Sequence, residues 1–541
     1  MGRWSLALLR RLGVPRPIVR KNSSPLAVVQ AVILLVLSTG NAVATTISPD
    51  SDLLDYQGVW YGAPKQPQMT WAGSALALNF RGAELAIDFD VGAQAENFRV
   101  VIDGVPNSSP LRIAPGRSHV ILATDLDPSQ AHEVVFFKET YDGSPSTLFG
   151  VELSDGAELL PPPSASDRRI AFYGDSNMDG TSNYSEHDSG FAGAYFAYPA
   201  ITARMLAART TTQAYGSATL TGYGDNNVMR FIYSPDFTTQ RPDFRTDFAP
   251  QLIVVNAGAN DIYRIAAEPG NGYGETSSSN PDTLRAQMKG RFKSVVAELR
   301  KVYGEAVHIV LYNAYGWDLN EPANYTAEVV AEVGGNLSYL HYPWTWEKWH
   351  GSMVEHGGQA RLLARHIATE MNWDIKAEPL IFDGFANAGQ VANGDFEAVA
   401  YGDFEAFGWR YASEHARREC DEANCWLSLA ADATVHQGFD ATGDYLPGPS
   451  PIGMVIQVRA MIRGDTGTRA QLVLDHEQQA LYQRNEVARQ HFDGLTNEWR
   501  EVMWQVPIPE GSWKLYLRLG AEDGTVEFDD VRTRFVMMDE K

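Results

Sequence analysis

The chain has 541 residues, which is too long for one ordinary hydrophobic core, and about three domains are expected for this length. Its composition, 44% hydrophobic and 21% charged, excludes a disordered protein. The formal net charge is −23, and a strongly acidic protein repels phosphate backbones, so nucleic acid is not expected as a partner.

Residues 1–44 have the layout of an export signal. Basic residues from Arg3 to Lys21 precede the apolar run 27–37, and Ala42-Val43-Ala44 fits a cleavage site of small residues. The apolar run is shorter than the about 20 residues that span a membrane, which disfavours the alternative of an uncleaved anchor. We therefore expect a signal peptide over 1–44, a secreted or periplasmic protein, and no membrane span after cleavage.

The segment 45–163 is predicted to be a β-sandwich of the jelly-roll kind. Short alternating apolar runs at 76–80, 85–89 and 98–102 are separated by Gly, Asp, Asn and Pro, the residues that turns favour. Prolines 161–163 follow as a stiff, short linker.

Residues 164–376 change character and predict an α/β/α domain. Apolar runs at 170–173, 252–255 and 307–311 do not alternate, as in strands buried on both faces of a parallel sheet. Helical patterns at 198–208, 282–303 and 353–371 lie between and after these runs. In such sheets the chemistry gathers at the carboxyl ends of the strands, where Ser176 and Asn260 both fall.

Residues 385–541 return to a β pattern and predict a second β-sandwich. Strand-like runs occur at 453–458, 470–474 and 513–519. The only two cysteines, Cys420 and Cys425, are close in sequence, and in an exported protein a local disulfide is the expected pairing. Catalysis by cysteine is not expected.

Ser176 is the candidate nucleophile, although Gly, Asp, Ser and Asn also suit an ordinary turn. A serine hydroxyl needs a base to take its proton and N–H donors to receive the oxyanion. The Asn260 amide is one candidate donor. The backbone N–H of Gly222, which follows a further apparent strand, is the other, with Gly216 and Gly224 as rivals.

The base is expected to be His350, with His356 left open. Ser352 and Glu355 form a capping-box pattern, which predicts a helix from residue 353 and places His350 in the loop before it. Gly357-Gly358 leaves room for a later helix start, which would make His356 the loop residue.

Residues just before His350 are expected to assist it. Glu347 is placed to orient the imidazole, a role that a backbone carbonyl can also fill. Trp344, Trp346 and Trp349 crowd the same loop and can stack on sugar rings, with core packing as the alternative.

These residues together resemble the SGNH, or GDSL-type, hydrolases. The resemblance rests on Gly174-Asp175-Ser176, on Gly222, on Gly258-x-Asn260-Asp261 and on a late histidine before the last helix. It implies a serine esterase in which Ser176 attacks and the late histidine is the base. The oxyanion hole would be formed by the Ser176 N–H, Gly222 and Asn260.

About residues 55–372 also resemble a subgroup, carbohydrate esterase family two. The shared features are the preceding β-sandwich, the segment 197–208, and Trp349-His350 with His356 six residues later. The family removes acetyl groups from xylan and glucomannan, and several members orient the histidine with a backbone carbonyl. The resemblance implies an acetylated polysaccharide as partner, no cofactor for catalysis, and substrate contacts from Trp349, Trp346 and Asp175. Departures from the family pattern are Asn177-Met178, Gly351 and Glu347.

Two other functions stay open from the sequence. One is a general acyl esterase or lipase with the same machinery, and the other is a non-catalytic carbohydrate-binding surface protein. The sequence names neither the polysaccharide nor the oligomeric state.

The C-terminal segment resembles carbohydrate-binding jelly rolls. The matching stretches are 393–397, Trp409 and 526–531. In such modules an early Glu and a late Asp often hold a structural calcium, which prefers oxygen ligands. The resemblance implies Glu397 and Asp529 as ligands, with Asp395 and Asp530 as further candidates.

Overall fold

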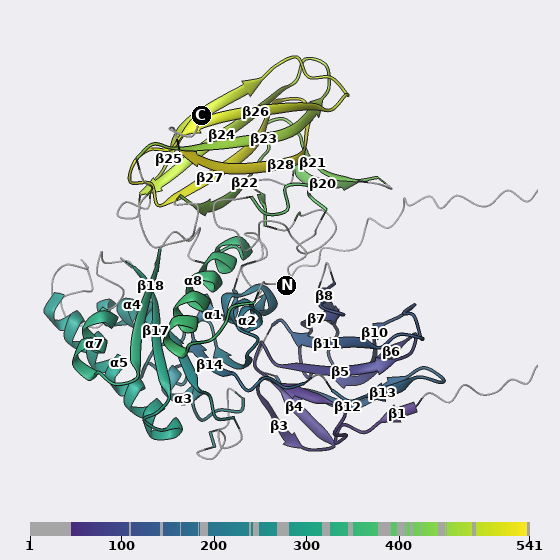
Figure 1. The fold of residues 1–541 in the computed structure, drawn as a ribbon, viewed down its shortest axis with the longest axis vertical. Coiled ribbons are helices and arrows are strands. Elements are labelled where there is room, and N and C mark those ends of the chain that lie inside the picture. The colour runs from purple at the N-terminus through teal and green to yellow at the C-terminus, as the bar shows by residue number, and fades with distance from the viewer. Residues whose placement is uncertain are drawn as a thin grey trace, which may run out of the picture. The chain divides into compact units, whose positions relative to one another are not determined.

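The computed structural model describes most of the chain from residue 45 to residue 537 (Figure 1). The segments left out of the description are 108–109, 141–143, 163, 182, 184–192, 237–239, 242–247, 268–280, 316–324, 344–349, 377–390, 398–405, 407, 412–414, 422–423, 442–449, 451 and 479–482. The export signal predicted over 1–44 lies outside the described residues, so it stays a prediction. Among the helices that are described, none is long and apolar enough to cross a membrane.

The N-terminal β domain consists of two antiparallel sheets that share one hydrophobic core. Phe89, Phe98 and Phe136 meet at its centre, with Phe98 and Phe136 stacked at 4.5 Å between ring centroids. The jelly-roll connectivity stays a prediction. One sheet runs β10 (Arg117–Ala123), β6 (Leu85–Asp90), β12 (Ser146–Leu153), β4 (Gln66–Met69), β3 (Trp60–Ala63), with β1 (Thr45–Ile47) on β12. The other runs β13 (Glu158–Leu160), β5 (Ala75–Arg81), β11 (His132–Lys138), β7 (Glu96–Ile102), β8 (Val105–Pro106), with β2 (Asp55–Gln57) on β5 and β9 (Leu111–Ile113) on β7.

The middle domain is built on a five-stranded parallel sheet, as the continuous apolar runs predict. Its strand order is β15 (Arg209–Ala214), β14 (Arg169–Gly174), β16 (Leu252–Asn256), β17 (His308–Tyr315), β18 (Leu337–Pro343). The helical elements are α1 (Ser176–Asp179), η1 (Ala194–Phe196), α2 (Tyr198–Met205), α3 (Val228–Phe231), α4 (Ala259–Ala267), α5 (Pro281–Tyr303), α7 (Thr326–Val333) and α8 (Met353–Met371).

Helices cover both faces of this sheet because alternate strand residues point to opposite sides (Figure 1). Ile170 and Phe172 of β14 pack in one core with residues of α2 and α8. Ala171 and Tyr173 of the same strand pack in a second core with residues of α3, α5 and α7. The strand ends are thereby held rigidly at one edge of the domain.

The C-terminal β domain also has two antiparallel sheets around one core. The predicted order of a β-rich domain, a parallel α/β domain and a second β-rich region is therefore confirmed. One sheet runs β19 (Arg410–Tyr411), β22 (Thr434–Asp440), β27 (Lys514–Asp523), β24 (Arg469–Gln478), β25 (Gln483–Phe492). The other runs β20 (Ala416–Cys420), β21 (Cys425–Leu429), β28 (Val526–Met537), β23 (Met454–Gly464), β26 (Arg500–Pro507).

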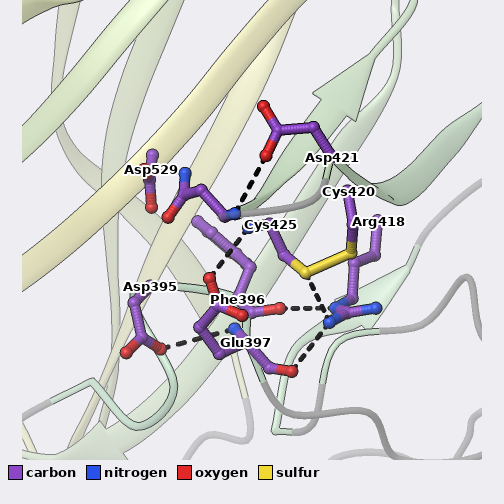
Figure 2. Close-up of a disulfide and its surroundings, with 9 residues drawn as sticks. Asp395, Phe396, Glu397, Arg418, Cys420, Asp421, Cys425 and Asp529 are labelled. Carbon is purple, nitrogen blue, oxygen red and sulfur yellow. Dashed lines mark hydrogen bonds between the residues drawn. A yellow bond between two sulfur atoms is a disulfide. The ribbon is translucent and has the colours of Figure 1, made fainter.

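A disulfide closes the hairpin between β20 and β21 (Figure 2). It joins Cys420 to Cys425, the pairing expected from their spacing. The hairpin holds an earlier loop: Arg418 donates to the backbone oxygens of Phe396 and Glu397, and the Cys425 N–H donates to Glu397 Oε1 at 2.8 Å. The loop before β19 is thus tied to the sheet by charged and backbone donors.

A buried ion pair connects the N-terminal β domain to the middle domain. Arg99 Nε donates to Glu139 Oε1 at 2.7 Å, and the two side chains are 1% and 0% exposed. The second carboxylate oxygen accepts the backbone N–H of Tyr195 in η1 at 2.8 Å. Glu139 therefore needs both partners, since a buried carboxylate is costly when it is unpaired.

Replacing Arg99 by Met should destabilise the protein by about 3–5 kcal/mol, because it leaves the Glu139 charge buried without its cation. Urea unfolding of the full chain measures the loss. Arg117→Met is the matched control in the same domain: its pair with Asp88 is solvent-exposed and is expected to contribute about 0–1 kcal/mol. Equal losses in the two variants would contradict the prediction.

Candidate active site

Ser176 lies just beyond the carboxyl end of β14, an inner strand of the parallel sheet, where the sheet topology predicts chemistry. It is the first residue of the short helix α1, whose N-cap is Asp175. The Asp175 side chain accepts the N–H of Asn177 at 3.0 Å, which fixes the turn immediately around the serine. The hydroxyl is therefore held on a defined backbone rather than on a free loop.

His350 is the base that the geometry favours. Its Nε2 lies 2.9 Å from Ser176 Oγ, although the two residues are 174 positions apart in the sequence. His350 precedes Ser352, the N-cap of α8, whose capping box forms as the sequence predicts. Burial and, secondly, the positive charge of Arg410 lower the pKa of His350 from 6.5 to about 4. At neutral pH the imidazole is thus neutral and able to accept a proton.

His356 has a different role. It is 1% exposed, its Nδ1 accepts the backbone N–H of Tyr198 at 3.3 Å, and its ring stacks on the Tyr198 ring. Burial, with the neighbouring His350 and Arg410, lowers its pKa to about 3. The ring is a neutral packing element between α8 and α2, and of the two histidines left open by the sequence only His350 meets the serine.

The Asp175 side chain is buried next to Ser176, with both carboxylate oxygens engaged by protein donors. It is fully buried, with Oδ1 accepting from the backbone and side chain of Asn177 and Oδ2 from the Asn260 amide at 3.3 Å. Burial, together with the charges of Asp179 and Asp261, raises its pKa to about 7. Asp175 is buried in this structure, and its expected contact with substrate stays a prediction.

Asn260 comes from the first turn of α4, directly after β16. Its Nδ2 donates to the backbone oxygen of Ala218 at 2.9 Å and to Asp175 Oδ2 at 3.3 Å. An amide nitrogen carries two hydrogens, so both are engaged in this arrangement. The longer bond, to Asp175, is the weaker of the two.

Asp261 and Arg291 brace the loop that carries Gly222. Gly222 has a φ of +73°, which other residues rarely adopt. Asp261 accepts the Leu220 N–H at 2.8 Å, and Arg291 of α5 donates to the backbone oxygen of Thr221 and lies 3.3 Å from Asp261. Asp261 stood in the Gly258-x-Asn260-Asp261 motif, whereas no local pattern marks Arg291.

Other predicted site residues fall outside the described part of the chain. These are Glu347, Trp346 and Trp349, together with Trp344. Whether Glu347 or a backbone carbonyl orients His350, and whether the tryptophans stack on sugar, therefore stay predictions.

The predicted calcium ligands of the C-terminal β domain are engaged with protein donors (Figure 2). Asp529 accepts from the Asn424 amide and from the Asp530 N–H, while Glu397 accepts the Cys425 N–H. Among the described residues, no group of three or more His, Cys, Asp or Glu is arranged to hold a metal ion. The calcium site therefore stays a prediction.

Chemically, the site is a serine hydrogen-bonded to a neutral, half-buried histidine at a strand end. This is the arrangement that activates a hydroxyl for attack on a carbonyl carbon. The Asn260 amide donates to Asp175, the residue before Ser176, and to Ala218, four residues before Gly222. The roles of Asn260 and of the Gly222 N–H as oxyanion donors stay predictions.

The chain is similar to carbohydrate esterases. A model described as the carbohydrate esterase 2 N-terminal domain matches residues 59–163. The cellulase/esterase CelE of Acetivibrio thermocellus is 29% identical over 354 residues, which are 60% of this chain and 41% of that protein. The chain thus spans less than half the length of this curated relative.

Solved structures of carbohydrate esterases are also similar to this chain. A family two carbohydrate esterase from Clostridium thermocellum, in complex with cellohexaose, is 26% identical with a TM-score of 0.51, covering 59% of this chain and 99% of that one. An acetyl xylan esterase from Butyrivibrio proteoclasticus is 17% identical with a TM-score of 0.53, covering 61% and 100%, and shows the fold alone. The resemblance to carbohydrate esterase family two is confirmed.

The lowered pKa of His350 predicts how Ser176 reactivity depends on pH. Protonated His350 cannot accept the serine proton. The rate at which a fluorophosphonate labels Ser176 should therefore stay unchanged below pH 6 and fall only as the pH drops through about 4. A fall near pH 7 that disappears in Asp175→Asn would belong to that carboxyl. A fall centred near 6.5 that persists in Asp175→Asn would contradict the prediction.

Proposed function

We propose that this protein is a secreted carbohydrate O-acetylesterase that removes acetyl groups from a polysaccharide of the xylan or mannan type. The observation that carries the proposal is the 2.9 Å contact between Ser176 Oγ and a neutral His350 Nε2 at the end of a parallel strand. The resemblance to carbohydrate esterases supports a carbohydrate ester as the substrate class.

In the proposed reaction, His350 Nε2 takes the Ser176 proton while Oγ attacks the acetyl carbonyl carbon. The resulting oxyanion is held by the N–H groups of Ser176 and Gly222 and by the Asn260 amide. This role requires Asn260 to exchange its 3.3 Å bond with Asp175 for one to the oxyanion. His350 then returns the proton to the departing sugar hydroxyl, leaving an acetyl-serine.

Deacylation uses the same groups in reverse order. His350 takes a proton from water, and the water oxygen attacks the acetyl-serine carbonyl carbon. The bond to Ser176 Oγ breaks, Oγ takes the proton from His350, and acetic acid leaves and ionises to acetate in solvent. No metal or organic cofactor takes part in the proposed steps.

Ser176→Ala should lower the rate of acetate release from acetylated xylan by at least about 10³-fold, because it removes the group that forms the covalent bond. His350→Ala should lose a comparable factor. His356→Ala is the matched control: it opens a packing defect, but per folded molecule it should keep the rate within about tenfold. Acetate release and thermal unfolding are measured on all three. Retained activity in Ser176→Ala would refute the mechanism.

The acyl chain and the sugar distinguish this proposal from a general acyl esterase or lipase. An enzyme that takes its binding energy from the polysaccharide gains nothing from a longer acyl chain, so acetyl esters should be preferred to octanoyl esters. Rates are compared across acetylated xylan, acetylated glucomannan and aryl esters of increasing chain length. Preference for the long chains would favour a lipase, and polysaccharide binding without turnover would favour a carbohydrate-binding protein.

A further inference from the structure

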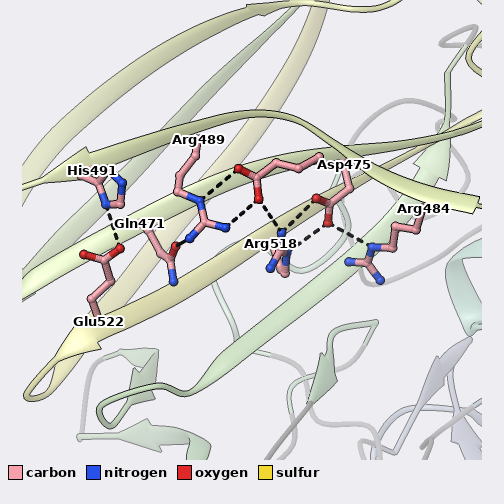
Figure 3. Close-up of polar contacts among 8 residues, drawn as sticks. Gln471, Asp475, Arg484, Arg489, His491, Arg518 and Glu522 are labelled. Carbon is pink, nitrogen blue, oxygen red and sulfur yellow. Dashed lines mark hydrogen bonds and ion pairs between the residues drawn. The ribbon is translucent and has the colours of Figure 1, made fainter.

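One face of the C-terminal β domain carries a row of ion pairs that are satisfied within that domain. Asp475 of β24 pairs with Arg518 of β27 and with Arg484 of β25, and Arg489 pairs with Glu486 (Figure 3). Residues opposite one another in an antiparallel pair share a face, which brings these side chains together. Each charge in this row has its counter-charge on a neighbouring strand or in its own strand.

Lys514 leaves this pattern, although it lies on the same strand only four residues before Arg518. Its Nζ forms an ion pair with Glu355 Oε1, and Glu355 belongs to α8 of the middle domain. The two side chains are 2% and 3% exposed, so the pair is buried. A buried lysine and a buried carboxylate are each costly without the other.

Gly438 of β22 makes room for this contact. A Cβ at this position would lie 2.6 Å from Lys514 Cε, closer than carbon atoms approach, and 3.1 Å from the ring of Tyr516. The Lys514 side chain passes over this glycine, with its ammonium 4.8 Å from the centroid of the Tyr516 ring. Helix α8 packs against β22 in the same region.

Glu355 divides its two oxygens between the helix and the lysine. Oε2 accepts the N–H of Ser352 at 2.7 Å, which closes the capping box at the start of α8. Oε1 forms the ion pair with the Lys514 ammonium. The segment that Glu355 closes begins two residues after His350, so the position of this carboxylate bears on where the imidazole sits.

A second residue of the same sheet reaches this region. Arg410 of β19 is 8% exposed, and its charge contributes to the lowered pKa values of both His350 and His356. β19 pairs with β22, the strand that carries Gly438. The edge of this sheet formed by β19, β22 and β27 therefore approaches the histidine side of the active site.

We propose that Lys514 is a positioning residue for the catalytic base: by neutralising Glu355 it keeps the α8 capping box closed and so holds His350 against Ser176. The proposal rests on the function proposed above. It makes the C-terminal β domain a working part of the catalytic unit and not only a binding module joined by a linker.

The experiment is a double-mutant cycle in the full-length protein, made of wild type, Lys514→Met, Glu355→Gln and the double variant. Gln keeps an oxygen that accepts the Ser352 N–H, so the cap survives while the charge is removed. Each single variant removes one charge of the buried pair, and the double variant removes both. Measured are kcat and KM for acetate release, the rate of Ser176 labelling by a fluorophosphonate, and thermal unfolding.

Each single variant should lower kcat and the labelling rate by roughly tenfold with KM unchanged, because a displaced base affects the chemical step and not ground-state binding. The double variant should recover most of the lost rate. Arg518→Met is the matched control, since it breaks an ion pair on the same strand and face without touching α8. It should lower the melting temperature and leave kcat and labelling unchanged.

Three results would overturn the proposal: wild-type kcat and labelling in Lys514→Met, no recovery in the double variant, or an equal loss of kcat in Arg518→Met. If Lys514→Met does not fold, the comparison of Glu355→Gln with the double variant tests the proposal: recovery of kcat and labelling in the double variant supports it, and no recovery overturns it. If the wild type labels at Ser176 but releases acetate from no glycan, the proposed function fails, and the labelling rates still test Lys514. A Ser176 that does not react at all would overturn both.

Discussion

The hydrogen bond between Ser176 and His350 is the constraint on which the rest of the structure depends. It joins two segments 174 residues apart, and an error of about 1 Å in either would cost reactivity steeply. The serine is fixed by β14, a strand buried on both faces between two cores. The histidine is fixed by the capped start of α8. Much of the middle domain can be understood as the support that brings these two ends together.

Burial has opposite effects on the acids and the base of this site, since it favours the uncharged form of each. It raises the pKa of Asp175 to about 7 and that of Asp261 to about 6, while it lowers that of His350 to about 4. The positive charge of Arg410 adds to the effect on the histidine. A neutral base in a largely dry environment is what a serine nucleophile requires, and the protein obtains it mainly by excluding water.

Sequence patterns predicted those elements whose structure depends on residues close in sequence. Helix α8 begins and ends at Met353 and Met371 as expected, because Ser352 and Glu355 mark its start in the sequence. Strand β14 was recognisable as an apolar run. Strand β18 was not, since Leu337–Pro343 mixes Ser, Tyr and His with its apolar residues and its burial depends on neighbours that are distant in sequence.

The site itself was predictable only as far as its motifs reach. The nearness of Ser176 and His350 was expected from the strand-end position of the serine, the loop position of the histidine and a resemblance. By contrast, the burial of Asp175 could not be predicted, because an Asp in an ordinary exposed turn would have the same neighbours in the sequence. Arg291 and Lys514 act through contacts with residues 70 and 159 positions away, respectively, and no spacing rule encodes such contacts.

The low pKa of His350 has a consequence for an enzyme of this proposed kind working in an unstirred, poorly buffered medium. Every turnover would release one molecule of a carboxylic acid, and deacetylating a dense polysaccharide would acidify the liquid around it. A histidine with an ordinary pKa of 6.5 would become protonated early in that process, whereas one near 4 stays neutral. A half-buried histidine with this pKa would thus make the proposed catalyst tolerant of its own product.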